Sequence, residues 1–256
     1  MHALKVGVFA DNLGLGVWEG VRKAAEICAD GIQIYTTHGE MLPENLTPAR
    51  RKELRAMIAG LGLTLSATCS DFGAGLVDEA RNRELLPKIK ANIDLAVDLG
   101  TAIITTHIGH VPEERANLVW GVLARALNEI GAYAEAHGVV LATETGPEPG
   151  STLKALLDSL DTGAIRVNFD PANFIIYGYD HRQALDDLRE YIAHTHAKDA
   201  KRGKGEVPLG KGDVDFPWYV GKLRGFGYQG FYTIEREAGK DPVGDVKRAI
   251  AFLRGM

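Results

Sequence analysis

The sequence alternates eight times between a short run rich in apolar and β-branched residues and a longer stretch with helical periodicity. This alternation predicts parallel strands, because each intervening helix carries the chain back to the start of the next strand. The predicted strands cover residues 4–9, 31–35, 63–68, 102–107, 139–144, 166–170, 194–198 and 231–235. The predicted helices cover residues 18–29, 48–60, 83–99, 113–137, 152–160, 183–191, 216–226 and 243–253.

Eight parallel strands and eight helices predict an α/β fold of the (β/α)8 type, a TIM barrel, which needs about 250 residues. The chain has 256 residues, and no linker or change in composition divides it, so we predict a single domain over residues 1–256. An open, doubly wound sheet is the alternative. The segment after the first strand, FADNLGLG, lacks the GxGxxG pattern of dinucleotide-binding sheets, which favours the barrel.

The formal net charge of −5 indicates that nucleic acid is not a partner, because binding along phosphates needs a basic surface. No apolar run approaches the roughly 18–20 residues of a membrane-spanning helix. The first residues, MHALKVGVFA, lead directly into a strand without a secretory leader. We therefore expect a cytoplasmic protein outside the membrane. Cys28 and Cys69 lie among apolar neighbours and are expected to be buried thiols.

Four acidic or imidazole side chains occupy one repeated setting, at or just past the end of a predicted strand. They are Glu144, Asp170, His196 and Glu235, and the gaps between them are 26, 26 and 39 residues. A gap of this size corresponds to about one strand–helix unit. The carboxyl ends of parallel strands in a barrel meet at one mouth, where barrel enzymes place their chemistry. The four side chains are therefore expected to converge.

Each of these residues also has a purely structural explanation. Asp170, directly before Pro171, fits the N-cap of a following helix, and His196 alone fits a hydrogen-bonded core histidine, as His194 does. Alternation along the strands nevertheless places the four on the barrel-facing side. Several carboxylates in one mouth repel each other unless a cation compensates them. Three carboxylates with one imidazole favour Mn²⁺, with Mg²⁺, Co²⁺ or Zn²⁺ as alternatives.

Four segments together resemble the xylose-isomerase-like barrel superfamily, in its sugar (phosphate) isomerase/epimerase group. They are ETG at 144–146, NFDPAN at 168–173, HxKD at 196–199 and GYQGFYTIERE at 227–237. This group includes the ketose 3-epimerases related to tagatose and psicose epimerase. The resemblance implies one divalent metal held by Glu144, Asp170, His196 and Glu235, with the two glutamates as the acid/base pair. It also implies a substrate-binding arginine six residues after the metal histidine, here Arg202, and a homodimer or homotetramer.

One position departs from the pattern that the resemblance implies. Related epimerases and the endonuclease branch commonly carry a histidine three residues after the sixth-strand aspartate, where this chain has Asn173. An asparagine can still hydrogen-bond a sugar hydroxyl. A multi-zinc nuclease would lose a ligand there, and the segment GKGDVDF supplies no Asp-x-His. The departure argues against a nuclease and leaves a sugar site in place.

The expected activity is a metal-dependent sugar isomerase or epimerase. It would move a proton next to the carbonyl of a ketose through an enediolate, either inverting C3 or interconverting aldose and ketose. Two alternatives remain open. The first is a keto-sugar lyase or dehydratase that uses the same metal and glutamate pair. The second is a non-catalytic barrel that only binds metal and sugar.

Further residues are candidates for contacts with a small-molecule sugar. His107 either donates to a substrate oxygen or packs at the barrel rim, and Glu148 either contacts a sugar hydroxyl or is a solvated loop charge. Lys198 and Arg202 either bind a phosphate group or neutralise the acidic rim. The sequence leaves the identity of the sugar, and whether it is phosphorylated, undecided.

Overall fold

The structure is a computed structural model that describes residues 3–256. Eight parallel strands close into a barrel in the order β1, β10, β7, β6, β5, β4, β3, β2, and β2 pairs with β1. The predicted (β/α)8 barrel is confirmed, and the open sheet is wrong. The barrel strands are Lys5–Phe9 (β1), Gly31–Tyr35 (β2), Thr64–Cys69 (β3), Ile103–Thr106 (β4), Val140–Glu144 (β5), Ile165–Phe169 (β6), Ile192–Ala197 (β7) and Phe231–Ile234 (β10).

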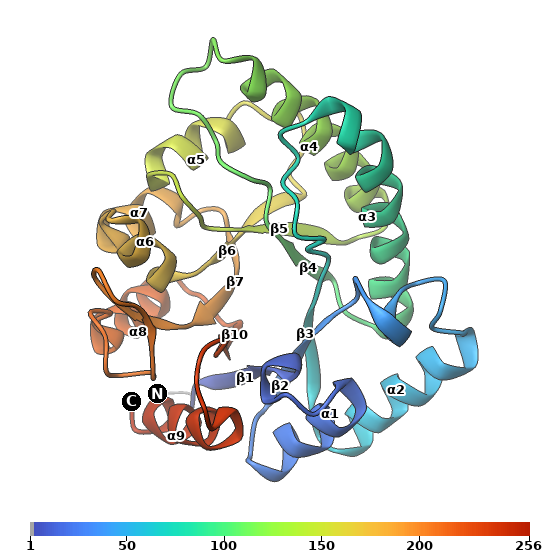
Figure 1. Cartoon of the computed structure of the whole chain (residues 1–256), viewed down its shortest axis with the longest axis vertical. Helices are drawn as coiled ribbons and strands as arrows, with labels where there is room; N and C mark the ends of the chain where they lie inside the picture. Colours follow the sequence, from blue (N-terminus) through green and yellow to red (C-terminus); the bar gives the residue numbers. More distant parts are fainter. Residues whose placement is uncertain (1–2) are drawn as a thin grey trace.

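The helices form a ring around these strands (Figure 1). Several begin as their sequences require. Thr47 precedes Pro48 and its hydroxyl accepts a hydrogen bond from the Arg50 backbone N–H, which is a typical helix start. The helices are Val17–Glu26 (α1), Pro48–Gly60 (α2), Glu79–Leu99 (α3), Leu118–Ala136 (α4), Gly150–Leu157 (α5), Pro171–Tyr177 (α6), His181–Leu188 (α7), Phe216–Gly225 (α8) and Pro242–Arg254 (α9).

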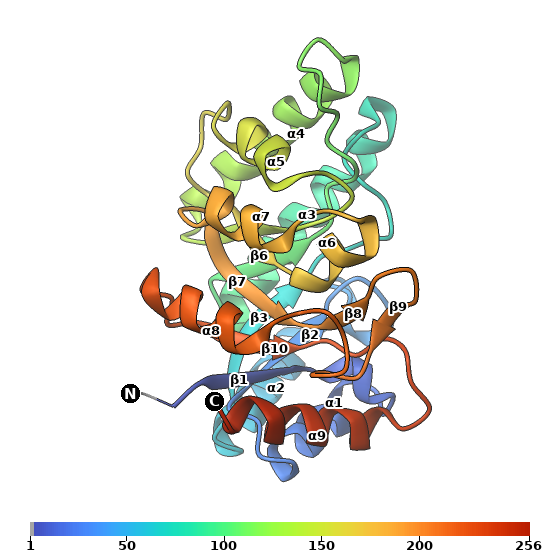
Figure 2. The same cartoon turned by 90° about the vertical axis from the view of Figure 1, so that its left-hand side faces the viewer.

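Each predicted strand is present with ends shifted by at most two residues. The structure adds elements that the sequence pattern did not predict. They are the short helix α6, an antiparallel hairpin of Asp199–Lys201 (β8) and Gly205–Val207 (β9), and the 3-10 helices Ala10–Leu13 and Gly39–Met41. Figure 2 shows the hairpin on the side of the barrel away from the chain termini, where the strands end. The hairpin packs against α6, so these two of the unpredicted elements lie together next to the barrel mouth.

The apolar core lies between strands and helices and includes the fully buried Leu141, Val167 and Ile234. Burial of one such side chain contributes roughly 1.5–3 kcal/mol. One expectation about buried residues is wrong. Cys69 is buried, but Cys28 is exposed, because it lies in the turn that follows α1. Among residues 3–256, none of the helices has the combination of length and apolar character that a membrane crossing requires.

The interior of the barrel is polar near the mouth. Gln33 on β2 is fully buried, and its side-chain oxygen accepts hydrogen bonds from His194 Nε2 at 2.9 Å and His196 Nε2 at 3.1 Å. Its amide nitrogen donates to Thr105 Oγ1 at 2.9 Å. His194 is the hydrogen-bonded core histidine that its position predicted. Burial lowers the pKa of His194 to about 3, which keeps its ring neutral.

Candidate active site

The four side chains at the strand ends come together in the structure. Glu144 ends β5, Asp170 follows β6, His196 lies in β7 and Glu235 follows β10. All four are buried, and one ligand atom from each lies within 4.8 Å of the others. Neighbouring strands in a closed barrel bring their ends to one mouth. Residues far apart in the sequence therefore meet at a single point, which we call the carboxylate–imidazole cluster.

His196 presents one ring nitrogen to the carboxylates. Its Nδ1 lies 3.4 Å from Glu144 Oε2, 3.4 Å from Glu235 Oε2 and 3.9 Å from Asp170 Oδ2. Its Nε2–H donates to the side-chain oxygen of Gln33, whose amide is oriented by Thr105. A hydrogen bond at one ring nitrogen fixes the tautomer and leaves the other nitrogen free for a cation. His196 could therefore serve as a metal ligand through Nδ1.

Asp170 divides its two oxygens between the helix and the cluster. Oδ1 accepts the backbone N–H of Ala172 at 2.7 Å and of Asn173 at 3.4 Å, and so forms the N-cap of α6. Oδ2 is buried and has no hydrogen-bond partner. A buried carboxylate oxygen without a partner is costly unless a cation approaches it. The helix cap and the ligand role, which compete when the sequence is read alone, are both compatible with this geometry.

The electrostatics of the cluster also fit a cation. Burial raises the pKa of Asp170 to about 7; Lys198 opposes this shift, and the charges of Glu144 and Glu235 add to it. Burial likewise opposes the charge on Glu235, but His196 and Lys198 together hold the pKa of Glu235 well below its usual range. The cluster thus holds three carboxylates, and Asp170 is left poorly compensated. Oxygen-rich donors with one imidazole match the preferences of divalent cations such as Mn²⁺ and Mg²⁺.

Lys198 lies beside the cluster, two residues after His196, and is only 5% exposed. Its ammonium group donates to Glu235 Oε2 at 2.8 Å and to Glu237 Oε2, and lies 4.0 Å from Asp170 Oδ2. Of the two roles that the sequence left open for Lys198, neutralisation of the acidic rim agrees with these contacts.

A cavity of about 240 Å³ opens on the cluster. Aromatic rings of Phe9, Tyr35 and Tyr177 form part of its wall, and polar groups form the rest. A concave site that combines aromatic walls with convergent polar groups is typical of small-molecule binding. The residues that line it are Phe9, Tyr35, Cys69, Asp71, Thr106, His107, Glu144, Gly146, Pro147, Asn173, Tyr177, Lys198, Glu235 and Glu237.

The family model described as "Xylose isomerase-like TIM barrel" matches residues 21–256, almost the whole chain. The chain belongs to the xylose isomerase-like TIM barrel family. This membership confirms the resemblance expected from the sequence motifs, and the barrel with its buried cluster agrees with it.

Individual members of the xylose isomerase-like family are related to the chain at moderate identity. A fructoselysine 3-epimerase of Shigella flexneri is 26% identical in an alignment that covers 91% of this chain and 90% of that protein. An inosose dehydratase of Clostridium perfringens is 28% identical in an alignment that covers 48% of each protein. The crystal structure of a xylose isomerase domain protein from Planctomyces limnophilus superposes with a TM-score of 0.87 at 29% identity, covering 99% of this chain and 96% of that one. The fructoselysine 3-epimerase, which matches most of the chain, supports the expected isomerase class.

Two further side chains of this family member complete the cavity beside Glu144. Asn173 donates to Glu144 Oε1 at 2.9 Å and to the Thr145 carbonyl at 3.0 Å. His107 Nε2 lies 3.7 Å from Glu144 Oε1, and its Nδ1 lies 2.9 Å from Asp71 Oδ2. The charge of Glu144 raises the pKa of His107 to about 9. Both residues, predicted to contact substrate, therefore face the cavity and Glu144.

Asp71 is a functional candidate that sequence reasoning missed. It lies two residues after Cys69, the last residue of β3, and it lines the cavity. A carboxylate just past a strand end is the same signal that identified the cluster. The signal was overlooked because the third strand was expected to end one residue earlier, at 68.

The structure does not bring Glu148 or Arg202 to the cavity. Glu148 is only 2% exposed, so its interpretation as a solvated loop charge is wrong. Its Oε2 accepts a hydrogen bond from the Val111 backbone N–H at 3.2 Å. Arg202 is exposed in the turn between β8 and β9, and its Nη1 donates to the Gly178 carbonyl at 3.2 Å. Their predicted contacts with substrate stay predictions.

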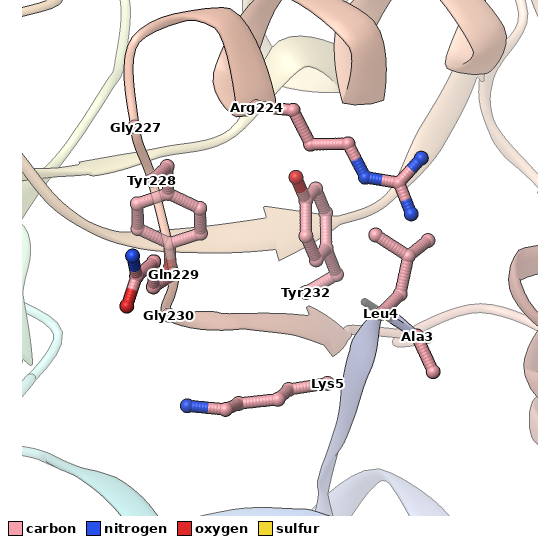
Figure 3. Close-up of a pocket in the computed structure, with 9 residues that line it drawn as sticks. All are labelled: Ala3, Leu4, Lys5, Arg224, Gly227, Tyr228, Gln229, Gly230 and Tyr232. Atoms are coloured by element: carbon pink, nitrogen blue, oxygen red, sulfur yellow. The ribbon is translucent and has the colours of Figure 1, made fainter. Parts of the chain in front are cut away.

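A wider cavity, of about 550 Å³, lies at the opposite end of the barrel (Figure 3). Its wall includes Lys5 at the start of β1 and Tyr232 near the start of β10. No member of the carboxylate–imidazole cluster lines it. In TIM-barrel enzymes the chemistry lies at the carboxyl ends of the strands. The smaller cavity at the mouth is therefore the candidate active site, despite its size.

Proposed function

We propose that this member of the xylose isomerase-like family is a divalent-metal-dependent sugar epimerase or isomerase that acts on a ketose. The observation that carries the proposal is the placement of Glu144 and Glu235. Both are buried, both line the cavity, and their Oε2 atoms lie at equal distances of 3.4 Å from His196 Nδ1. They come from β5 and β10, which are separated in the barrel by β6 and β7. Two carboxylates can thus approach one substrate from different sides.

The two glutamates supply the proton transfers of an epimerisation. One carboxylate takes the proton from C3 of the ketose, and the electron pair of the C–H bond moves toward the carbonyl. The other carboxylic acid returns a proton to the opposite face of C3, which inverts that carbon. Removal of a proton from C1 instead, with return of a proton to C2, would interconvert ketose and aldose. Proton transfer by a positioned side chain contributes about 10²–10⁴-fold to the rate.

Surrounding residues hold this pair in place. Asn173 and Asn168 donate to the two oxygens of Glu144 at 2.9 and 3.3 Å, and Lys198 donates to Glu235. Glu144, Asp170, His196 and Glu235 would hold the metal, a fit supported by the unpartnered Asp170 Oδ2. A divalent cation bound there would act as a Lewis acid on the carbonyl oxygen of the substrate.

Hydrogen exchange from D₂O tests the proposal. Protein supplied with Mn²⁺ should incorporate deuterium into a ketose at C3 for epimerisation, or at C1 for aldose–ketose isomerisation. Glu144→Gln and Glu235→Gln should each reduce exchange by about 100-fold or more, because amides cannot accept the proton. Glu84→Gln on the exposed surface of α3 is the matched control and should behave as wild type. Exchange in Glu235→Gln at the wild-type rate would refute the scheme.

The same experiment separates the alternatives. Loss of water from the substrate would indicate a dehydratase, an activity favoured by the similarity to the Clostridium perfringens inosose dehydratase over part of the chain. Absence of exchange with every ketose, together with measurable sugar binding, would indicate a barrel that binds sugar without catalysis.

A further inference from the structure

The loops after the last two barrel strands contain an anion-binding arrangement that the chain fills itself. In TIM barrels a phosphate group is frequently bound by the loops after the seventh and eighth strands, here β7 and β10. We propose that the substrate of the candidate active site is an unphosphorylated sugar, because a carboxylate of the protein occupies this position. The inference rests on the proposed function and specifies its substrate class.

The carboxylate belongs to Glu206, in strand β9 of the loop that follows β7. Its Oε2 accepts the backbone N–H groups of Glu237 at 3.2 Å and Ala238 at 3.0 Å, both in the loop that follows β10. Its Oε1 pairs with Arg236 Nη1. Two successive backbone N–H groups and an arginine are the donors that proteins commonly offer to a phosphate. Here they bind a side chain of the same chain.

Arg236 is held by a second carboxylate besides Glu206. Its Nε donates to Asp245 Oδ2 at 2.9 Å, and the side chains of all three residues are only about one-tenth exposed, at 10% for Arg236, 9% for Glu206 and 11% for Asp245. Removing one partner from a buried ion pair leaves an uncompensated charge. A phosphate would have to displace Glu206 into water and replace both of its contacts.

The cations that line the cavity are paired in the same way. Lys198 is held by Glu235 and Glu237, and His107 lies between Asp71 and Glu144. Four carboxylates line the cavity in total, and each of the two cations is paired with two of them, so neither is left to bind a phosphate. The exposed cations of the hairpin, Lys201, Arg202 and Lys204, do not line the cavity.

Matched pairs of sugars test the inference. Exchange from D₂O is measured with fructose, tagatose and ribulose, and with the phosphate esters of the terminal hydroxyl of each. We expect kcat/KM at least tenfold higher for the free sugars. A preference for the esters would overturn the inference and leave the proposed function intact. If neither series exchanges, the proposed function fails, and binding of inorganic phosphate tests separately whether Glu206 fills the anion-binding arrangement.

Calorimetric titration of the metal-loaded protein with inorganic phosphate provides that measurement. Wild type should show no phosphate binding that depends on Arg236. Glu206→Ser leaves the backbone N–H groups of Glu237 and Ala238 without their acceptor, so this variant should bind phosphate at least tenfold more tightly than wild type. Glu206→Ser combined with Arg236→Gln should lose the gain, and Glu129→Ser on α4 is the control. Phosphate binding to wild type that Arg236→Gln weakens would overturn the inference. So would a folded Glu206→Ser variant without the gain; if that variant does not fold, the wild-type titration decides.

Discussion

At the scale of single residues, Glu148 is an ionisable group placed where water does not reach. It is 2% exposed, and its one hydrogen bond to a backbone donor, the Val111 N–H, compensates its charge only in part. Burial therefore raises the pKa of Glu148 from its usual 4.5 to about 7. Between these two values the folded chain keeps the proton that the unfolded chain releases. The free energy of unfolding thus falls as the pH rises through this window.

Glu148→Gln should remove this pH dependence, because glutamine has nearly the same shape and no charge to bury. Relative to wild type, its free energy of unfolding should rise by about 1–3 kcal/mol between roughly pH 4.5 and pH 8. Urea denaturation of both proteins at the two pH values gives this difference. Glu84→Gln, at an exposed position, should show none. A constant difference across the window would mean that Glu148 is ionised in the folded protein throughout.

At the scale of elements, the seven-residue helix α6 connects strand β6 to the candidate active site. Asp170 caps its first turn with Oδ1, and Asn173 in that turn holds Glu144. A helix this short is not stable by itself, so its cap and its packing determine whether it forms. The cap and the cluster therefore share one carboxylate.

Two substitutions at Asp170 separate these roles. Asp170→Asn keeps a good N-cap acceptor and removes a buried charge, so without metal the free energy of unfolding should equal or exceed that of wild type. Asp170→Ala should lose about 1 kcal/mol through the missing cap. Both should bind Mn²⁺ at least tenfold more weakly in calorimetric titration. If Asp170→Asn bound Mn²⁺ as tightly as wild type, Asp170 would have only the structural role.

The same element shows what the sequence could and could not predict. Strand ends follow from local patterns of apolar residues, and because a barrel brings those ends to one mouth, Glu144, Asp170, His196 and Glu235 could be identified as a set. The helix α6 was missed because seven residues are too few to show periodicity. The hairpin β8–β9 was missed because its strands have three residues each and contain charged side chains.

Contacts that depend on long-range packing could also not be predicted from the sequence. The sequence gives no sign that Glu206 meets the N–H groups of Glu237 and Ala238, since the partners lie about 30 residues apart in irregular segments. Arg202 was assigned from its offset to His196, but the hairpin carries it to the Gly178 carbonyl. Offsets within a chain fix position along an element, whereas the direction of a loop side chain is set by its neighbours in space.

At the scale of the whole molecule, the cluster connects four strands of the barrel, β5, β6, β7 and β10. These strands are consecutive around the barrel wall, so one point joins half of its circumference. Without a metal ion, the carboxylate of Asp170 at that point lacks an adequate counter-charge. A ligand that binds only the folded state stabilises it according to its concentration and affinity.

Metal should therefore raise the melting temperature of the whole barrel. At a Mn²⁺ concentration of about 100 times Kd, the stabilisation is about 2.7 kcal/mol, which corresponds to roughly 5–10 °C for a domain of this size. Differential scanning calorimetry with Mn²⁺ and with excess chelator measures the shift. Glu144→Gln and Glu235→Gln should melt below the wild-type temperature in chelator, since each takes a carboxylate partner from a buried cation, His196 or Lys198, and both should gain less from Mn²⁺. A shift of equal size in wild type and in both variants would place the metal elsewhere, because a cation outside the cluster is insensitive to its carboxylates.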